Sequence, residues 1–245
     1  MKKVVLGSLF LLTTIATFAQ KDSTRSGGLF KKASGILGGK SGSGSSLSGE
    51  QIAAGLKEAL SVGAEKSAKK LSSPDGFLKD AAVKILLPPE VVEVEKKMRM
   101  LGMGKLLDNT ITSMNRAAED ASKSAAPIFV SAVKQMSITD ALGILKGQDT
   151  SATAYLRKAT TSELTTAFRP VIEQSLVKMD VNKYWKDVFS AYNKFSSTPV
   201  NTDMNAYVTE RALNGLFYYV GQEEKNIRAN PAARVSDILK SVFGK

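Results

Sequence analysis

The chain has 245 residues, with 34 Lys and Arg against 23 Asp and Glu, and it contains neither Cys nor His. The missing Cys excludes disulfides, thiol nucleophiles and Cys-ligated zinc or iron–sulfur sites. The missing His excludes His-ligated metals, Ser-His-Asp triads and a charge switch near neutral pH. These absences favour a protein that is not an enzyme, with no catalytic residue, no metal and no cofactor.

Residues 1–19 have the pattern of a secretory signal peptide. Two lysines precede an apolar run from Val4 to Ile15, and small residues at Thr17 and Ala19 fit cleavage after Ala19. The run is shorter than the roughly 20 residues that span a bilayer, which favours cleavage over a membrane anchor. No Cys follows the cleavage site, so a lipoprotein is excluded. We expect export through the general secretion route to the periplasm, as a soluble protein.

Residues 20–49 are rich in Gly and Ser and are predicted to form a disordered basic linker, because they bury too little apolar surface to offset their chain entropy. A second interpretation is weak contact of residues 28–40 with an anionic membrane surface. Five glycines between Gly27 and Gly39 oppose a helix there. The candidate membrane contacts are Leu29, Phe30, Lys31, Lys32, Ile36 and Leu37.

The net charge of +11 does not point to nucleic acid. Residues 20–70 carry nine basic and four acidic side chains, whereas residues 71–245 carry 23 and 19. A nucleic-acid-binding domain would show a basic face on a recognisable module, and the sequence contains none. We expect no nucleic-acid partner.

From Ser48 onward the apolar residues recur at helical spacing, and no stretch alternates with the period of a strand. The predicted fold class is all-α, a single irregular bundle of about nine helices over residues 50–245. Ser48 with Gln51, Ser137 with Asp140, and Asp203 supply helix caps. After a first helix from Ser48 and a turn at residues 73–76, the expected helices cover residues 90–101, 104–126, 127–136, 137–147, 150–159, 162–179, 182–195, 203–229 and 231–243.

The expected helix at residues 203–229 is apolar on more than one side. Met204, Val208 and Ala212 line one face, and Leu213 and Phe217 supply a second. A helix with this pattern has neighbours on several sides, so we expect it at the centre of the bundle.

Three polar groups are candidates for a site, each with a structural alternative. The groups around Glu119 and Glu224 fit either a polar site or ion pairs that orient helices. The carboxylate of Glu210 lies on the apolar helix, where burial would raise its pKa as a general acid requires, or place it in a satisfied polar network. The candidate residues are Asn115, Arg116, Glu119, Arg157, Glu210, Arg211, Asn214, Glu223, Glu224, Arg228 and Arg234.

A glycosidase would need two carboxylates on opposite sides of a cleft. Glu163, Glu210 and Glu223 could supply them, but no spacing in the sequence places two of them together. Aromatic residues at helical spacing fit either a sugar-stacking platform or, more commonly, a core. They are Tyr184, Trp185, Phe189 and Tyr192.

Five runs of the sequence resemble a bacterial family. They are residues 52–60, 75–78, 114–119, 207–217 and a C-terminal run from residues 223–234 through 242–244. The chain is similar to the family named domain of unknown function 4197 over about residues 51–244. The resemblance implies an exported, single-domain helical protein of Gram-negative bacteria, with no assigned activity and no catalytic residue to transfer. It also implies Asp at the position of Asn214.

Three functions remain open from the sequence. The first is a periplasmic, non-enzymatic helical domain that binds an envelope protein or a small apolar ligand. The second is a carboxylate-dependent hydrolase or lyase acting on envelope glycans. The third is a membrane-surface protein docked by its basic N-terminal linker.

Overall fold

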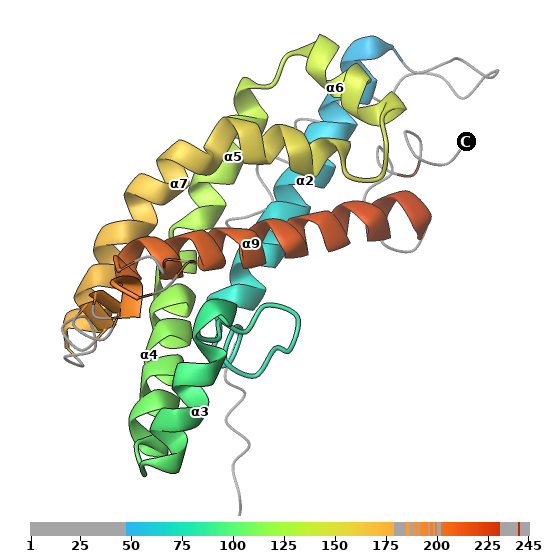
Figure 1. Cartoon of the computed structure of the whole chain (residues 1–245). Coiled ribbons are helices and arrows are strands. Elements are labelled where there is room, and N and C mark those ends of the chain that lie inside the picture. Colours follow the sequence, from blue (N-terminus) through green and yellow to red (C-terminus); the bar gives the residue numbers. More distant parts are fainter. Residues whose placement is uncertain are drawn as a thin grey trace, which may run out of the picture. The chain divides into compact units, whose positions relative to one another are not determined.

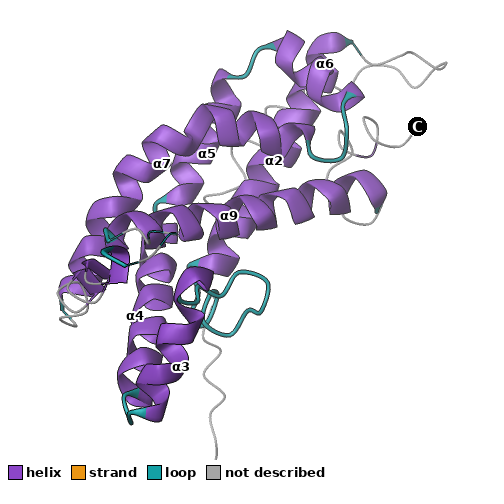
Figure 2. Cartoon of the chain, viewed as in Figure 1, coloured by secondary structure: helices purple, strands orange, loops and turns teal. Residues whose placement is uncertain are grey.

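The computed structural model describes residues 48–178, 185–186, 189–190, 192–195, 197, 199, 202–230 and 240. These residues form seven α-helices and one 3₁₀ helix and contain no strand, which confirms the all-α prediction (Figure 1, Figure 2). The signal peptide, the linker with its candidate membrane contacts, and Arg234 lie outside the described residues. The elements are α2 (Gly49–Leu71), η1 (Pro89–Val91), α3 (Val92–Met100), α4 (Gly104–Ser122), α5 (Ala125–Gln135), α6 (Ile138–Lys146), α7 (Ser151–Val177) and α9 (Met204–Ala229).

The helix caps lie where local sequence signals predict them. Ser48 accepts a hydrogen bond from the N–H of Gln51 (3.2 Å), and the Gln51 side chain accepts one from the N–H of Ser48 (2.9 Å). Ser137 and Asp140 form the same reciprocal arrangement at the start of α6. Asp203 accepts from the N–H of Ala206 at the start of α9. Each cap satisfies N–H groups that the helix itself leaves without partners.

α9 is the central helix, as predicted. Half of its residues are buried, and it packs against α2, α4 and α7. In Figure 1 it crosses α2, while α7 also packs on α4 and α5. The largest fully buried side chains come from several elements, among them Phe77, Phe129, Phe168 and Phe217. Rings of Phe129 on α5 and Phe217 on α9 meet edge to face with centroids 5.7 Å apart.

The prediction of two helices at residues 150–159 and 162–179 is wrong, because α7 is a single helix. The polar stretch at Thr160 and Thr161 does not break it. The Thr160 hydroxyl donates to the Leu156 carbonyl (2.7 Å), and the Thr161 hydroxyl donates to the Arg157 carbonyl (2.6 Å). Hydroxyls that bond one turn back along the helix leave the backbone ladder intact.

The boundary between α4 and α5 also differs from the prediction. α4 ends at Ser122 rather than at residue 126, and α5 begins at Ala125 rather than at Pro127. Pro127 therefore lies in the first turn of α5. The first N–H groups of a helix have no partner within it, so a residue without an N–H is tolerated there.

Gly215 lies in α9 where the helix touches the segment that follows α2. A Cβ atom there would lie 2.7 Å from Cε1 of Phe77 and 3.2 Å from Cβ of Val83, whereas a Cβ on Gly143 of α6 would meet no atom within 4 Å. We expect Gly143→Ala to raise the free energy of unfolding by about 0.5–1 kcal/mol through helix propensity. Gly215→Ala should lower it by about 1–3 kcal/mol, because Phe77 must move. Urea denaturation measures both changes, and a stabilised Gly215→Ala variant would contradict the close packing.

Candidate functional site

The first polar cluster attaches the turn after α2 to α4. Buried Glu119 accepts hydrogen bonds from the backbone N–H groups of Phe77 (3.1 Å) and Leu78 (3.2 Å). Arg116 bridges the carboxylates of Glu119 (2.7 Å) and Asp75 (2.6 Å). These two interactions raise the pKa of the Arg116 guanidinium, so it keeps its charge. The cluster fixes a turn against a helix, which is a structural use of these groups.

Asn115 is fully buried in α4 and holds the segment that leads to η1. Its Oδ1 accepts from the N–H of Ile85 (2.8 Å), and its Nδ2 donates to the carbonyls of Ile85 (2.8 Å) and Ile111 (2.7 Å). The Tyr207 hydroxyl donates to the carbonyl of Leu86 (2.8 Å). The backbone of this segment is therefore held against α4 and α9, although it belongs to no helix.

Glu224 and Arg228 join α9 to the corner between α6 and α7. The Glu224 carboxylate accepts from the N–H groups of Ala152 (3.0 Å) and Thr153 (2.8 Å) in the first turn of α7. Arg228 donates to Glu224 (3.0 Å) and to the Ile144 carbonyl (2.9 Å) in the last turn of α6. A carboxylate at a helix N-terminus and a cation at a helix C-terminus each complement the local dipole. The pair thus caps two helices at once.

Glu210, Arg211 and Asn214 do not form the predicted buried site. All three are exposed, because they lie on the stripe of α9 that faces away from the core. Asn214 accepts a hydrogen bond from Arg157 (3.1 Å), whose guanidinium lies 4.4 Å from the ring centre of Phe217. The expectation of a buried carboxylate at position 210 is wrong. The general-acid hypothesis depended on that burial, so it loses its support.

The carboxylates considered for hydrolysis are not brought together. Glu163 and Glu210 are exposed, and Glu223 pairs with Lys66 (2.8 Å). None of the three lines the two cavities described below.

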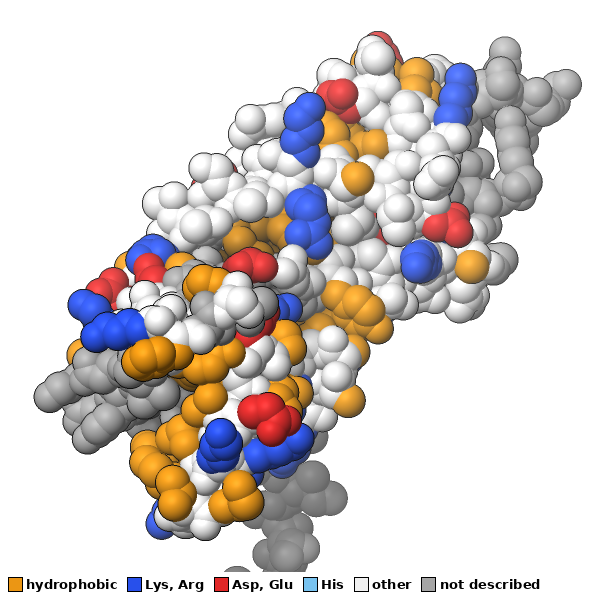
Figure 3. Space-filling view, in the orientation of Figure 1, with side chains coloured by type: hydrophobic (Ala, Val, Ile, Leu, Met, Phe, Trp, Pro, Cys, Tyr) orange, Lys and Arg blue, Asp and Glu red, His pale blue; other side chains and the backbone are white. Residues whose placement is uncertain are grey.

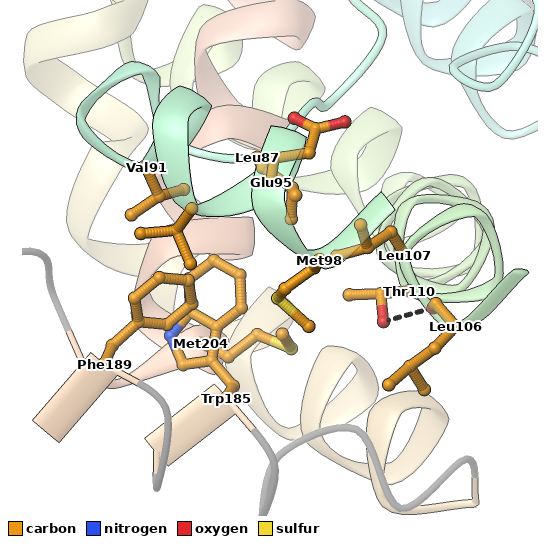
Figure 4. Close-up of a pocket in the computed structure, with 11 residues that line it drawn as sticks. Leu87, Val91, Glu95, Met98, Leu106, Leu107, Thr110, Trp185, Phe189 and Met204 are labelled. Carbon is orange, nitrogen blue, oxygen red and sulfur yellow. Dashed lines mark hydrogen bonds between the residues drawn. The ribbon is translucent and has the colours of Figure 1, made fainter. Parts of the chain in front are cut away.

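An apolar pocket lies beside α3, between η1, α4 and the first turn of α9 (Figure 4). Its free volume is about 50 Å³. The polar side chains in its wall are Glu95 and Thr110, whose hydroxyl donates to the Leu106 carbonyl (2.9 Å). In Figure 4, Met98 and Met204 extend toward each other inside the ring of lining side chains. The lining residues are Leu87, Val91, Val94, Glu95, Met98, Leu106, Leu107, Thr110, Trp185, Phe189 and Met204.

One wall of this pocket is aromatic. The rings of Trp185 and Phe189 meet edge to face with centroids 4.5 Å apart, and Trp185 also stacks on Tyr207 at 5.7 Å. Trp185 and Phe189 are buried, which confirms the core interpretation for these two residues. Tyr192 is half-buried and donates to the Glu90 carbonyl (3.0 Å), and Tyr184 lies outside the described residues.

A wider cleft of about 930 Å³ lies on the other side of α3, bounded by residues 78–89, α4 and α9. Arg211, Asn214 and Tyr207 line this cleft. Burial raises the pKa of the Tyr207 hydroxyl. Two carboxylates also line it, Glu95 and Asp108. Both lie 2.9 Å from the Arg99 guanidinium. Arg99 therefore bridges the two carboxylates, and Lys84 and Arg211 add two more positive charges to the cleft wall.

α3 separates the two cavities and is itself weakly buried. Leu87 and Glu95 line both cavities. No residue of α3 is fully buried, and Val94 and Met98 are its partly buried contacts with the core. A helix with few buried apolar contacts has a low free energy of local opening. Among the elements of the pocket wall, we therefore expect α3 to have a low free energy of local opening.

Sequence reasoning missed this pocket. Val91, Val94 and Met98 are spaced three and four residues apart on one helix face, which was the available signal. Their partners Leu107 and Met204 are distant in the chain, so spacing alone could not bring them together.

Among the described residues, no group of three or more Asp and Glu is placed to hold a metal ion. No single helix in this part of the chain has both the length and the apolarity to cross a membrane; α5 and α6 pass that test only as a pair bent by 104°.

Comparison with known proteins places the chain in a family. The model of the family described as "Protein of unknown function (DUF4197)" matches residues 46–244. No curated protein and no solved structure matches the chain. The family match confirms the resemblance found in the sequence and covers most of the 245 residues. The chain therefore belongs to the DUF4197 family of proteins of unknown function.

Proposed function

We propose that this protein is an exported, non-enzymatic binding domain of the cell envelope that takes a small apolar ligand in the pocket beside α3. Export is supported by the signal-peptide pattern of residues 1–19. Binding is supported by the pocket itself, whose lining is apolar apart from Glu95 and Thr110. That lining is the observation that carries the proposal.

The pocket's size and walls define the kind of ligand. Its volume of about 50 Å³ is far below the roughly 300–1,000 Å³ typical of drug-sized ligands. A narrow aliphatic chain fits this limit better than a ring system. Met98 and Met204 have flexible side chains that repack around such a chain, while Trp185 and Phe189 supply a rigid wall. A small displacement of α3 would lengthen the pocket.

The carboxylates favour binding over hydrolysis. Glu119 and Glu224 are occupied by backbone N–H groups and by an arginine each. The two carboxylates of the wide cleft share Arg99. Glu119 and Glu224 are also buried, so neither carboxylate is accessible to a glycan. No observation therefore favours the glycan hydrolase as a second candidate.

Titration with n-alkanols of increasing length tests the proposal. Trp185 is the single tryptophan and lines the pocket, so its emission reports entry of the chain at this site. Each methylene that enters should add about 0.8 kcal/mol, or about fourfold in affinity. Val94→Phe should fill the pocket and abolish the response. Val62→Phe, on the exposed face of α2, is the matched control and should leave it unchanged.

Two results would contradict the pocket as a binding site. One is an affinity that does not depend on chain length. The other is an equal response from Val94→Phe and the parent protein, with both proteins showing the same unfolding midpoint.

A further inference from the structure

Large apolar side chains are exposed where α3 meets α4. Met100 is 79% exposed, Leu101 78%, Met103 40% and Leu106 37%. They surround the bend at Gly102, whose φ of 82° reverses the chain between the two helices. Burial within the described residues does not account for these side chains. A cluster of exposed apolar residues of this kind marks an interaction surface.

The same segment is strongly basic. Residues 96–105, called the hairpin tip below, contain four cations and no acid. Lys96 pairs with Glu93 (2.8 Å), and Arg99 pairs with Glu95 and Asp108. Lys97 and Lys105 are exposed and take part in no ion pair among the described residues.

The arrangement of the two kinds of side chain indicates the partner. Figure 3 shows hydrophobic and basic side chains next to one another at the end of α3 and α4. Figure 1 shows α3 and α4 joined as a helical hairpin. By sequence, Met100, Leu101 and Met103 lie at the bend, Lys97 lies in the last turn of α3, and Lys105 lies in the first turn of α4. Apolar side chains that enter the acyl boundary, with cations at the level of the headgroups, are the pattern of an interfacial anchor.

We propose that the hairpin tip docks this protein on an anionic lipid surface. Met100 and Leu101 enter the interface, and Lys97 and Lys105 contact the anionic headgroups. This assigns the membrane contact to the folded domain rather than to residues 28–40 of the linker. It does not depend on the pocket, although Met98 of the tip also belongs to the pocket wall, and Leu106 of that wall adjoins the tip.

Vesicle sedimentation with the chain from Gln20, which keeps the linker and lacks the proposed signal peptide, tests this surface. The parent protein should bind vesicles of phosphatidylglycerol and phosphatidylethanolamine more tightly than vesicles of phosphatidylcholine, and added salt should weaken the binding. The double variant Met100→Ser/Leu101→Ser should lose about tenfold in partitioning for each side chain. Its control is Val62→Ser/Val177→Ser, which removes exposed apolar side chains from α2 and α7 and should bind like the parent.

A second pair of variants isolates the charge. Lys97→Gln/Lys105→Gln should lose about fivefold for each lysine on anionic vesicles. Lys158→Gln/Lys178→Gln has the same net charge, with both changes on exposed positions at α7, and should bind like the parent. All these positions are exposed, so we expect the melting temperature of every variant to match that of the parent. This measurement verifies that the fold is intact.

Three outcomes would overturn the proposal. In the first, the tip variants bind vesicles as the parent does, which would move the contact to the linker. In the second, the control variants lose as much binding as the tip variants. In the third, the tip variants change self-association but not vesicle binding, which would make the tip a contact between copies. Met100 and Leu101 do not line the pocket, so Met100→Ser/Leu101→Ser should keep the n-alkanol response of the parent. The membrane proposal and the pocket proposal can therefore fail independently.

Discussion

Glu224→Ala should lower the free energy of unfolding by about 3–5 kcal/mol, the largest effect we expect from a single substitution in this domain. The change leaves the Arg228 guanidinium, whose side chain is 13% exposed, without its carboxylate. It also leaves the N–H groups of Ala152 and Thr153 without their acceptor. Urea denaturation followed by far-UV circular dichroism measures the loss.

The matched control lies on the same helix. Glu210→Ala removes an exposed carboxylate from α9 and should change the free energy of unfolding by no more than about 0.5 kcal/mol. The loss of stability in the double variant Glu224→Ala/Arg228→Ala should be smaller than the sum of the losses in the two single variants, because the double variant removes both members of the ion pair. Equal losses for Glu224→Ala and Glu210→Ala would show that the cap at the α6–α7 corner contributes little.

Asn115→Ala should lower the free energy of unfolding by about 2–4 kcal/mol. It leaves the buried N–H and carbonyl of Ile85 without partners, and each unsatisfied group costs about 1–3 kcal/mol. The segment from Ile85 to Leu87 should loosen as well, since the Tyr207 hydroxyl is then the one side chain among the described residues that bonds to its backbone. Because Leu87 lines both cavities, the n-alkanol response of Trp185 should weaken too.

Asn109→Ala is the control for this substitution. Asn109 is exposed on the same helix, two turns before Asn115 in the chain, and its replacement should change stability and Trp185 response little. Amide hydrogen exchange provides a local readout, with faster exchange at Ile85 expected in Asn115→Ala alone. Unchanged exchange there would contradict the role assigned to this side chain.

The fold was predictable where its signals are local. The caps at Ser48, Ser137 and Asp203 need only three or four residues to be recognised, and all three are present. The length of α7 was not predictable in this way. Thr and Ser hydroxyls can either end a helix or donate to a carbonyl one turn earlier within it. The burial of Leu156 and Leu164 favours the continuous helix.

The polar sites were less predictable because their partners are distant in the chain. Asn115 bonds to a residue 30 positions away, and Glu224 to one 72 positions away. Helical spacing identified Glu119 and Glu224 as members of polar groups, but it could not say which backbone they would cap. At Glu210 the two apolar faces of α9 suggest a buried carboxylate, whereas the stripe of the helix that carries this residue is exposed.

The hairpin tip was overlooked for a different reason. The order of acidic residues before basic residues across residues 90–101 is explained by the helix dipole alone. Because the dipole accounts for the basic residues at the end of this helix, their number alone does not indicate a binding surface. The exposure of Met100 and Leu101 beside those cations is a property of the folded domain, and spacing in the sequence does not reveal it.

The bridge from α9 to the α6–α7 corner also sets an order of events during folding. A chain made from its N-terminus presents the first turn of α7 long before residues 224–228 exist to cap it. Closing so long a loop is slow, and the core around α9 cannot form until that helix is present. Until then the first turn of α7 lacks this cap, although α2, α4, α5 and α7 can already pack on one another. For a protein that crosses a membrane unfolded, as residues 1–19 lead us to propose, the cap would form only after the C-terminal part of the chain has been made.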